Sequence, residues 1–212
     1  MARLFWNREK TSGSFAVLRS LVSDGLDFVL IGGWAVYYYT RQQESLDVDI
    51  AISYDRLEFF RNAGIADHEG TRIKYSIRNG IYVDIFVSEF SDPDLPISVS
   101  EILKHFNAID GVKVVDREML LLLKLWGYFR DDEVKVRKDI IDVASLVIYG
   151  DINLSRVAAL ARRYKIPARR GADVLLEYMD KAETLTEFVG MGLNEYKKAK
   201  ILAKRDIHAA FG

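Results

Sequence analysis

The sequence predicts an α+β fold, in which a mixed sheet with flanking helices is followed by an all-helical C-terminal domain. Three observations support this prediction. Strand and helix patterns alternate between residues 26 and 90, and Asn79-Gly80 between two alternating runs indicates a β-hairpin. From Arg117 onward, the segments have the apolar spacing of helices. We therefore place a boundary near residue 116, which gives domains of residues 1–116 and 117–212.

The first domain is predicted to consist of short elements. "LDVDIAIS", for example, alternates apolar and polar residues, as a half-buried strand does, and "DFVLIGG" is a short apolar run closed by two glycines. The predicted ranges are helix 15–25, strand 27–33, helix 34–43, strand 46–53, helix 56–64, hairpin 72–88 and strand 111–116.

The second domain contains five segments with helical periodicity, at residues 117–129, 137–150, 155–164, 168–190 and 195–211. Basic residues outnumber acidic ones here, with clusters in "RRYKIPARR" and "KKAKILAKR". These clusters are either solvated helix faces or a patch for a polyanion such as RNA, and the sequence leaves both readings open.

The composition excludes several classes of protein. The chain has 212 residues, 50% of them hydrophobic, which is ample for a packed core. It has no cysteine, which excludes disulfides, thiolate nucleophiles and cysteine-bound zinc, and its three histidines are far apart. The longest apolar run, Met119–Leu123, is much too short to cross a membrane. We expect a soluble, cytoplasmic protein without a membrane partner.

Three aspartates stand out in the predicted strands. Side chains two residues apart in a strand share a face, so Asp47 and Asp49 lie opposite the aliphatic face of their strand. Asp84 has the same relation to the aliphatic residues of "YVDIFV". If these strands are neighbours, all three carboxylates converge on one face.

Converging carboxylates repel one another and favour a bound cation. Because neither cysteine nor a nearby histidine accompanies them, the ligands are oxygen atoms, which select Mg²⁺ or Mn²⁺. The alternative is that Asp47 and Asp49 only line the wet face of a strand.

Gly32 and Gly33 separate a predicted strand from a predicted helix. Glycines allow the backbone to approach a ligand closely, and the first N–H groups of a helix attract anions, so the pair is a candidate phosphate cradle. It matches neither the dinucleotide fingerprint nor the Walker A loop. A plain tight turn is the alternative.

With "LIGGWA", "LDVDIAI" and "YVDIFV" in this order, the chain resembles the nucleotidyltransferase superfamily with the polymerase-beta-like fold. The resemblance implies a nucleotidyltransferase-type sheet and a metal-dependent enzyme that transfers a nucleoside monophosphate from a nucleoside triphosphate to an acceptor hydroxyl, with release of pyrophosphate. It implies that Asp47 and Asp49 hold metal ions, and that Asp84 binds the second metal or accepts the hydroxyl proton. Gly32 and Gly33 would bind phosphate oxygens.

Three further residues are candidates for nucleotide binding. Arg41 either reaches phosphate or compensates the C-terminus of its helix. The stretch from Lys124 through "VRKDIID" resembles abortive-infection and toxin–antitoxin nucleotidyltransferases, which implies that Lys124 binds triphosphate and Asp139 supports the active site. "GGWAV", "RQ" and "DVDIAI" also resemble aminoglycoside and lincosamide nucleotidyltransferases.

The acceptor stays open between a protein hydroxyl, a tRNA end and a small molecule. A toxin–antitoxin type enzyme would also have a small cognate partner protein. Two other functions compete: a catalytically silent, antitoxin-like module that binds a nucleotide or a partner, and a metal-dependent phosphohydrolase that uses the same carboxylates.

Overall fold

The computed structural model describes residues 8–62, 67–69, 72–77, 80–91, 97–127 and 132–212. Its described residues form two compact units. The first unit contains residues 8–38 and 44–116, and the second contains residues 39–43 and 117–212.

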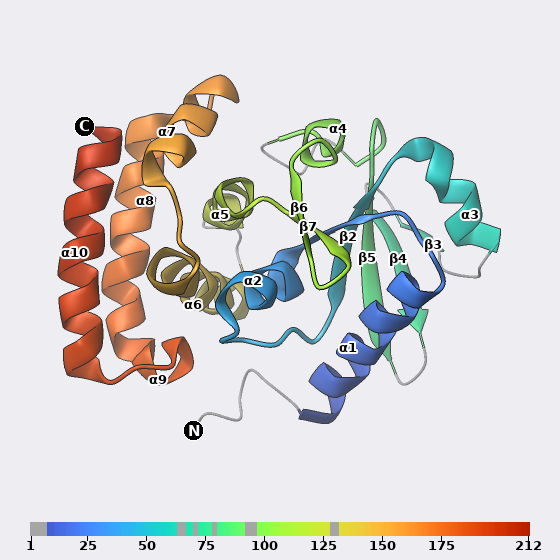
Figure 1. The fold of residues 1–212 in the computed structure, drawn as a ribbon, viewed down its shortest axis with the longest axis horizontal. Helices are drawn as coiled ribbons and strands as arrows, with labels where there is room; N and C mark the ends of the chain where they lie inside the picture. The colour runs from blue at the N-terminus through green and yellow to red at the C-terminus, as the bar shows by residue number, and fades with distance from the viewer. Residues whose placement is uncertain (1–7, 63–66, 70–71, 78–79, 92–96, 128–131) are drawn as a thin grey trace. The chain divides into compact units, whose positions relative to one another are not determined.

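The first unit is built on a seven-stranded sheet with the order β3-β4-β5-β2-β1-β7-β6 (Figure 1). The strands are β1 Val29–Ile31, β2 Val48–Ile52, β3 Asp67–Glu69, β4 Arg72–Ile77, β5 Ile81–Val87, β6 Phe106–Ile109 and β7 Val112–Val115. β2 runs parallel to β5 and β1 parallel to β7, whereas the other neighbours are antiparallel. The predicted mixed sheet is therefore confirmed. The sequence analysis missed β3 and β6, two short edge strands.

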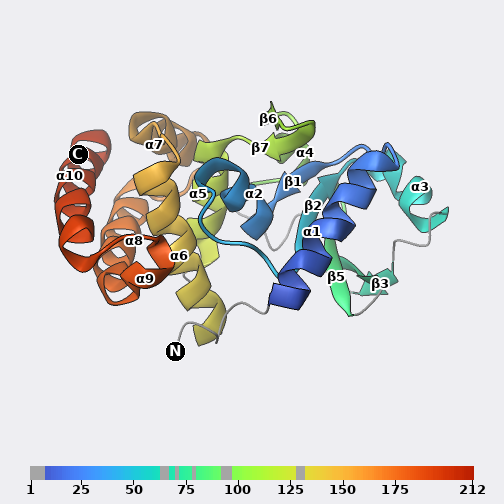
Figure 2. The ribbon, with the colours of Figure 1, turned by 60° about the horizontal axis from the view of Figure 1, so that its bottom comes forward.

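The helices of this unit are α1 Arg8–Ser23, α2 Gly32–Thr40, α3 Leu57–Asn62 and α4 Val99–Ile102, with a 3₁₀ turn η2 at Tyr54–Arg56. α1 lies along β2 and β5 (Figure 2) and buries Val17, Leu18 and Leu21. α2 begins at Gly32, so the glycine pair forms the first turn of this helix and does not precede it as predicted.

The aliphatic faces of β2 and β5 form the centre of the core. Val48, Ile50 and Ile52 are fully buried, as are Val83, Ile85 and Val87 of the neighbouring strand. This confirms the predicted two-faced character of both strands, because alternate residues point to opposite sides of a sheet. The hairpin predicted around Gly80 is confirmed by the antiparallel pairing of β4 with β5, and Gly80 has the left-handed φ of 75° typical of such turns.

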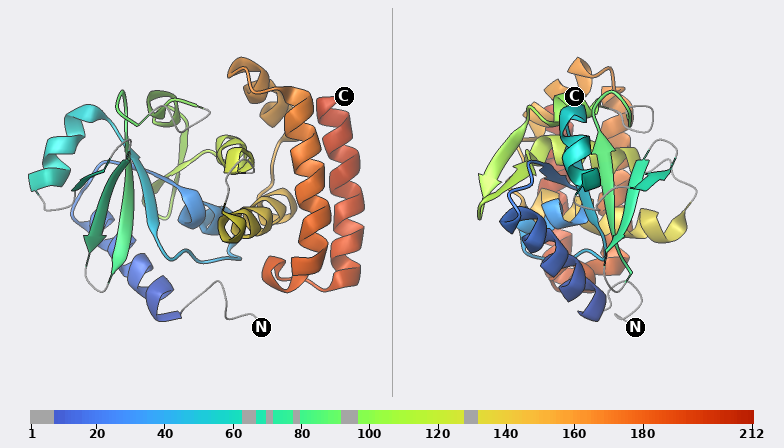
Figure 3. Two further views of the ribbon diagram at one scale, coloured as in Figure 1. Left: turned by 180° about the vertical axis from the view of Figure 1, so that it is seen from behind. Right: turned by 90° about the vertical axis from the view of Figure 1, so that its right-hand side faces the viewer.

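The second unit contains helices and no strand among its described residues, which confirms the predicted all-helical second half. Its elements are α5 Arg117–Trp126, α6 Glu133–Tyr149, α7 Leu154–Arg163, α8 Ala168–Lys181, η5 Ala182–Leu185, α9 Thr186–Val189 and α10 Leu193–Phe211. α8 and α10 lie side by side (Figures 1 and 3). Between them the buried hydroxyl of Tyr196 donates a 2.7 Å hydrogen bond to the Met179 carbonyl.

Two helix boundaries in this unit differ from the prediction. α6 begins at Glu133 and not at Arg137, because the Asp132 carboxylate caps it by accepting hydrogen bonds from two backbone N–H groups. The single helix predicted over 168–190 is broken by η5, and its last turn ends at Gly190 with a φ of 79°. In the described part of the chain, no helix combines the length and apolar character needed to cross a membrane.

Candidate functional site

Strand register brings the glycine pair, Asp49 and Asp84 to one region of the first unit. Asp49 pairs with Ile31, the last residue of β1, on one side and with Asp84 of β5 on the other. Register partners in neighbouring strands point to the same face, and such strands are about 4.8 Å apart. Asp47 directly precedes β2, and all three aspartates are half-buried. The two strands are neighbours, as the convergence of the carboxylates requires.

The Asp49 carboxylate lies directly against the backbone of Gly32. A β-carbon at Gly32 would be 2.6 Å from Cγ of Asp49 and 2.8 Å from its Cβ, and would overlap its Oδ2. Gly32 also has a φ of 67°, which side-chain-bearing residues rarely adopt. The glycine is therefore needed both for the backbone turn and for the space that Asp49 occupies. The sequence predicted a phosphate cradle or a plain tight turn at the glycine pair, and it did not predict the contact with Asp49.

A chain of hydrogen bonds positions Asp47, and the sequence did not predict it. The Ser45 hydroxyl donates to Oδ1 of Asp47 at 2.7 Å, and Ser45 is completely buried. The Ser45 carbonyl accepts a 2.5 Å hydrogen bond from the Ser14 hydroxyl of α1, which in turn accepts one from the Trp34 indole. The signal available in the sequence was the serine two residues before Asp47.

Oxygen ligands for a divalent cation are present on this face, but they do not form a ready-made cage. Among the described residues, no group of three or more histidine, aspartate or glutamate side chains is arranged so that it could hold a metal ion. Mg²⁺, however, is usually bound by one or two carboxylates together with water and substrate phosphates. The adjacent pair Asp49 and Asp84 fits that mode of binding. Asp47 lies two residues before Asp49, directly before β2.

The other predicted charged residues belong to the second unit. Nζ of Lys124 on α5 lies 3.1 Å from Oδ1 of Asp139 and 2.7 Å from Oδ2 of Asp142, both on α6. The three side chains are 12%, 5% and 1% exposed. Lys124 is therefore not a snorkelling surface lysine but the cation of a buried cluster, which we call the Lys124 cluster.

The Lys124 cluster contains two carboxylates and one ammonium group. Burial raises the pKa of Asp142 above its ordinary value, and the charges of Lys124 and Lys138 oppose this shift only in part. Gly127 packs against the second oxygen of Asp139: a β-carbon there would lie 3.1 Å from Cγ of Asp139. Lys124 and Asp139 were predicted from the sequence, and the structure adds Asp142 to them.

Arg41 follows the last residue of α2 and is exposed, with a φ of 56°. This is the left-handed position at which many helices end. Like Lys124 and Asp139, it is part of the second unit, whereas the glycine pair and Asp47, Asp49 and Asp84 are part of the first.

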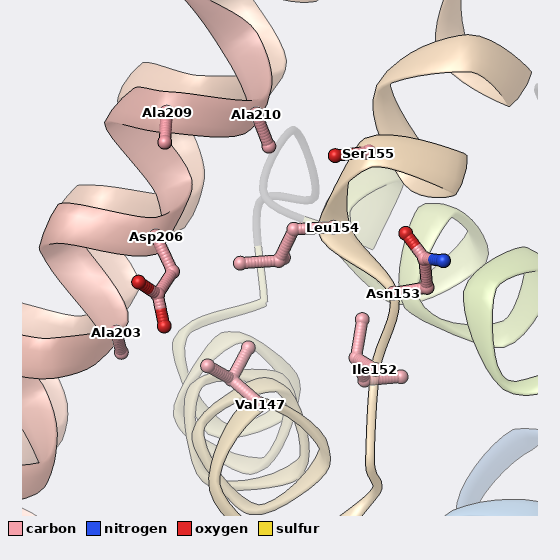
Figure 4. A pocket seen from close by; sticks show the side chains of 9 residues that line it. All are labelled: Val147, Ile152, Asn153, Leu154, Ser155, Ala203, Asp206, Ala209 and Ala210. Atoms are coloured by element: carbon pink, nitrogen blue, oxygen red, sulfur yellow. The ribbon is translucent and has the colours of Figure 1, made fainter.

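A pocket of about 390 Å³ lies in the second unit between the start of α7 and α10 (Figure 4). Leu154 points from α7 toward α10, where Ala203 and Asp206 line the other side. A second pocket, of about 520 Å³, is lined by Arg137 and Ile140 of α6 and by residues at the end of α8 and in η5. Among the described residues, the predicted site residues line neither pocket.

Comparisons with known proteins identify a similar solved structure. No family model matches the chain, and no curated protein matches it either. A similar solved structure is that of an antigenic nucleotidyltransferase-like protein from Paracoccidioides brasiliensis. It is 16% identical, with a TM-score of 0.48, and the match covers 88% of this chain and 94% of that chain.

Proposed function

We propose that this chain is a Mg²⁺-dependent nucleotidyltransferase, which transfers a nucleoside monophosphate from a nucleoside triphosphate to an acceptor hydroxyl and releases pyrophosphate. The observation that supports this most is the position of Asp49, between the glycine turn of α2 and Asp84 on the next strand. A backbone turn for phosphate and two adjacent carboxylates for a cation are the parts that such a transfer requires.

Asp47, Asp49 and Asp84 are the residues that would hold Mg²⁺ or Mn²⁺. When bound, the cation would neutralise charge on the triphosphate and on the attacking and leaving oxygens. Asp84 would accept the proton of the acceptor hydroxyl, and the N–H groups of the first turn of α2 would bind phosphate oxygens. Ser45 holds one oxygen of Asp47, which fixes the orientation of that carboxylate.

The remaining residues that we propose for nucleotide binding belong to the second unit. Lys124 and Arg41 are the cations that we assign to the triphosphate. Asp139 and Asp142 hold the Lys124 ammonium in a fixed place, so its charge does not need to be ordered when the substrate arrives. This is the positioning role that we propose for Asp139.

The acceptor is proposed by class: a protein hydroxyl, a tRNA end or a small molecule. If the chain is of toxin–antitoxin type, a small cognate protein is its partner. A silent module on the same fold would bind the nucleotide or the partner without transferring anything. A phosphohydrolase would release inorganic phosphate in place of pyrophosphate.

Incubation with each α-labelled nucleoside triphosphate and Mg²⁺ tests the proposal. The reaction is offered total protein, total tRNA and a panel of aminoglycosides, and pyrophosphate and phosphate are measured separately. Asp47→Ala and Asp49→Ala are the inactive references. Asp55→Ala changes an exposed aspartate outside the sheet face that carries Asp47, Asp49 and Asp84, which we call the carboxylate face.

We expect label in one acceptor class and an equal amount of pyrophosphate, both lost in Asp47→Ala and Asp49→Ala but retained in Asp55→Ala. If no nucleotide is transferred while calorimetry still detects nucleotide binding, the silent module is the correct function. Label transfer that survives both substitutions would contradict the assigned site.

A further inference from the structure

Only part of the carboxylate face is open to solvent. Along β5 this face carries Tyr82, Asp84 and Phe86, of which Phe86 is 6% exposed and therefore covered. On β2, Ala51 is likewise buried, whereas Asp49 is half-buried. On these two strands, the open part of the face thus consists of carboxylates and one aromatic ring.

Tyr82 is 55% exposed and precedes Asp84 by two residues on the same face of β5. Val48 of β2 pairs with Val83 of β5, and one residue earlier on each chain segment come Asp47 and Tyr82. Asp84 follows two residues later on the same side of β5, at a distance of about 7 Å along the strand. Tyr82 therefore shares its face of β5 with Asp84 and belongs to the same end of these strands as Asp47.

A single exposed aromatic side chain is ordinary in a soluble protein and needs no explanation by itself. Tyr54, in η2 beyond the opposite end of β2, is 58% exposed and lies outside the strands that carry Asp49 and Asp84. The position of Tyr82 is different because ligands of a polyphosphate site are its neighbours on the same face. A flat ring beside such a site is suited to stacking on a nucleobase.

We propose that Tyr82 is a stacking platform for a nucleobase at the carboxylate face. The inference rests on the proposed function and identifies a nucleobase as the group that binds at the solvent-exposed part of this face. The base is either that of the incoming nucleoside triphosphate or that of a nucleic-acid acceptor. Tyr82 is two strands away from the end of β1, where the glycine turn lies, so the phosphates and the base occupy separate parts of the face.

Binding measurements test this without depending on transfer. The full chain and its variants Tyr82→Ala, Tyr82→Phe, Tyr82→Trp and Tyr54→Ala are titrated calorimetrically in Mg²⁺. The probes are ATP, GTP, CTP and UTP, inorganic tripolyphosphate, which has no base, and a single-stranded RNA dodecamer. Circular dichroism and thermal melting verify that each variant is folded.

We expect Tyr82→Ala to weaken binding of the nucleotides or of the RNA about tenfold, with tripolyphosphate binding unchanged. Tyr82→Phe and Tyr82→Trp should retain binding, since stacking needs the ring and not the hydroxyl, and Tyr54→Ala should match the unmodified chain. Weaker nucleotide binding identifies the substrate base, and weaker RNA binding with unchanged nucleotide binding identifies an acceptor base.

Three results would overturn the proposal: unchanged binding of all probes by Tyr82→Ala, equal losses in Tyr82→Ala and Tyr82→Phe, or an unmodified chain that binds neither nucleotides nor RNA. If the unmodified chain binds nucleotides through Tyr82 but transfers no label, the proposed transfer is wrong while the stacking role remains.

Discussion

Asp49 and Asp139 are both aspartates packed against a glycine, but they differ in burial and in the charged residue paired with them. Asp49 lies against Gly32, is half-buried, and has another aspartate as its register partner. Asp139 lies against Gly127, is almost fully buried, and has a lysine 3.1 Å away. In each unit a missing side chain makes room for a carboxylate.

The two aspartates illustrate two roles of a buried or half-buried charge: one forms an internal ion pair, and the other favours binding of a cation. The Lys124 cluster contains its own counter-ion, so its carboxylates are largely neutralised before any ligand binds. On the carboxylate face, like charges stand side by side, an arrangement that favours an added cation. We therefore expect substitutions on the carboxylate face to affect mainly activity, and substitutions in the Lys124 cluster to reduce stability as well as nucleotide binding.

The largest effect is expected for Asp49→Asn. The substitution preserves the shape against Gly32 but removes the charge, and we expect the rate of nucleotide transfer to fall about 10³-fold. The free energy of unfolding should change by less than about 1 kcal/mol, because the like-charge contact with Asp84 is relieved. Initial rates of label transfer and urea unfolding measure the two quantities. A large loss of stability with little loss of transfer rate would contradict the expectation that the carboxylate face affects mainly activity.

Lys124→Met tests the other side of the contrast. Removing the ammonium leaves two buried carboxylates without their counter-ion, and breaking such a buried pair destabilises by about 3–5 kcal/mol. Lys104→Met is the matched control, because the Lys104–Glu101 ion pair has an exposed lysine and should contribute less than about 1 kcal/mol. Urea unfolding of both variants gives the comparison, and equal effects would show that burial of the Lys124 cluster is unimportant.

The sequence predicted which residues lie on the carboxylate face, but it did not predict the contacts that hold them in place. The period of two in "LDVDIAI" and "YVDIFV" assigns each aspartate to a face, and the buried aliphatic residues of β2 and β5 confirm that assignment. The lateral pairing of Asp49 with Asp84 depended on strand order, which alternation along one strand does not specify.

The contacts that support the site depend on tertiary packing. Ser45 is distant from Ser14 in sequence, and no local pattern predicts that α1 delivers a hydroxyl to the Ser45 carbonyl. The overlap of Gly32 with Asp49 likewise arises from the pairing of β1 with β2. The charge of the Lys124 cluster was visible in the sequence, but its burial requires α5 to pack on α6.

Gly32→Ala measures how closely Asp49 is packed. Both Gly32 and Gly25 have left-handed backbones, with φ of 67° and 70°, so alanine at either position should reduce the free energy of unfolding by about 1 kcal/mol or more. At Gly25 an added β-carbon meets nothing within 4 Å, whereas at Gly32 it overlaps the Asp49 carboxylate. We expect Gly32→Ala to be the more destabilising by about 1–2 kcal/mol. Equal losses in urea unfolding would mean that Asp49 moves aside freely.

Asp142→Asn tests the protonation state of the Lys124 cluster. Because burial raises the pKa of Asp142 in the folded state, the folded chain binds this proton more tightly than the unfolded chain. Its contribution to stability is therefore complete below the ordinary pKa of an aspartate and is lost as the pH rises through the raised pKa. We expect Asp142→Asn to lack this decline, so its stability relative to the unmodified chain should increase as the pH rises from the ordinary pKa of an aspartate to the raised one. A difference independent of pH, measured by urea unfolding, would show that Asp142 does not titrate in that interval.

The smallest effect is expected for Ser45→Ala, which removes the hydrogen bond to Asp47 and leaves the Ser45 carbonyl in place for Ser14. One such bond contributes about 1 kcal/mol, so the transfer rate should fall several-fold if Ser45 acts by orienting Asp47. A double-mutant cycle with Asp47→Ala, which removes the acceptor of this hydrogen bond, separates this role from a general loss of packing. If Ser45 acts only through Asp47, Ser45→Ala has no further effect on the residual rate once Asp47 is changed. If the two losses multiply, Ser45 supports the fold and not the carboxylate, and the carboxylate face owes its geometry to the strands alone.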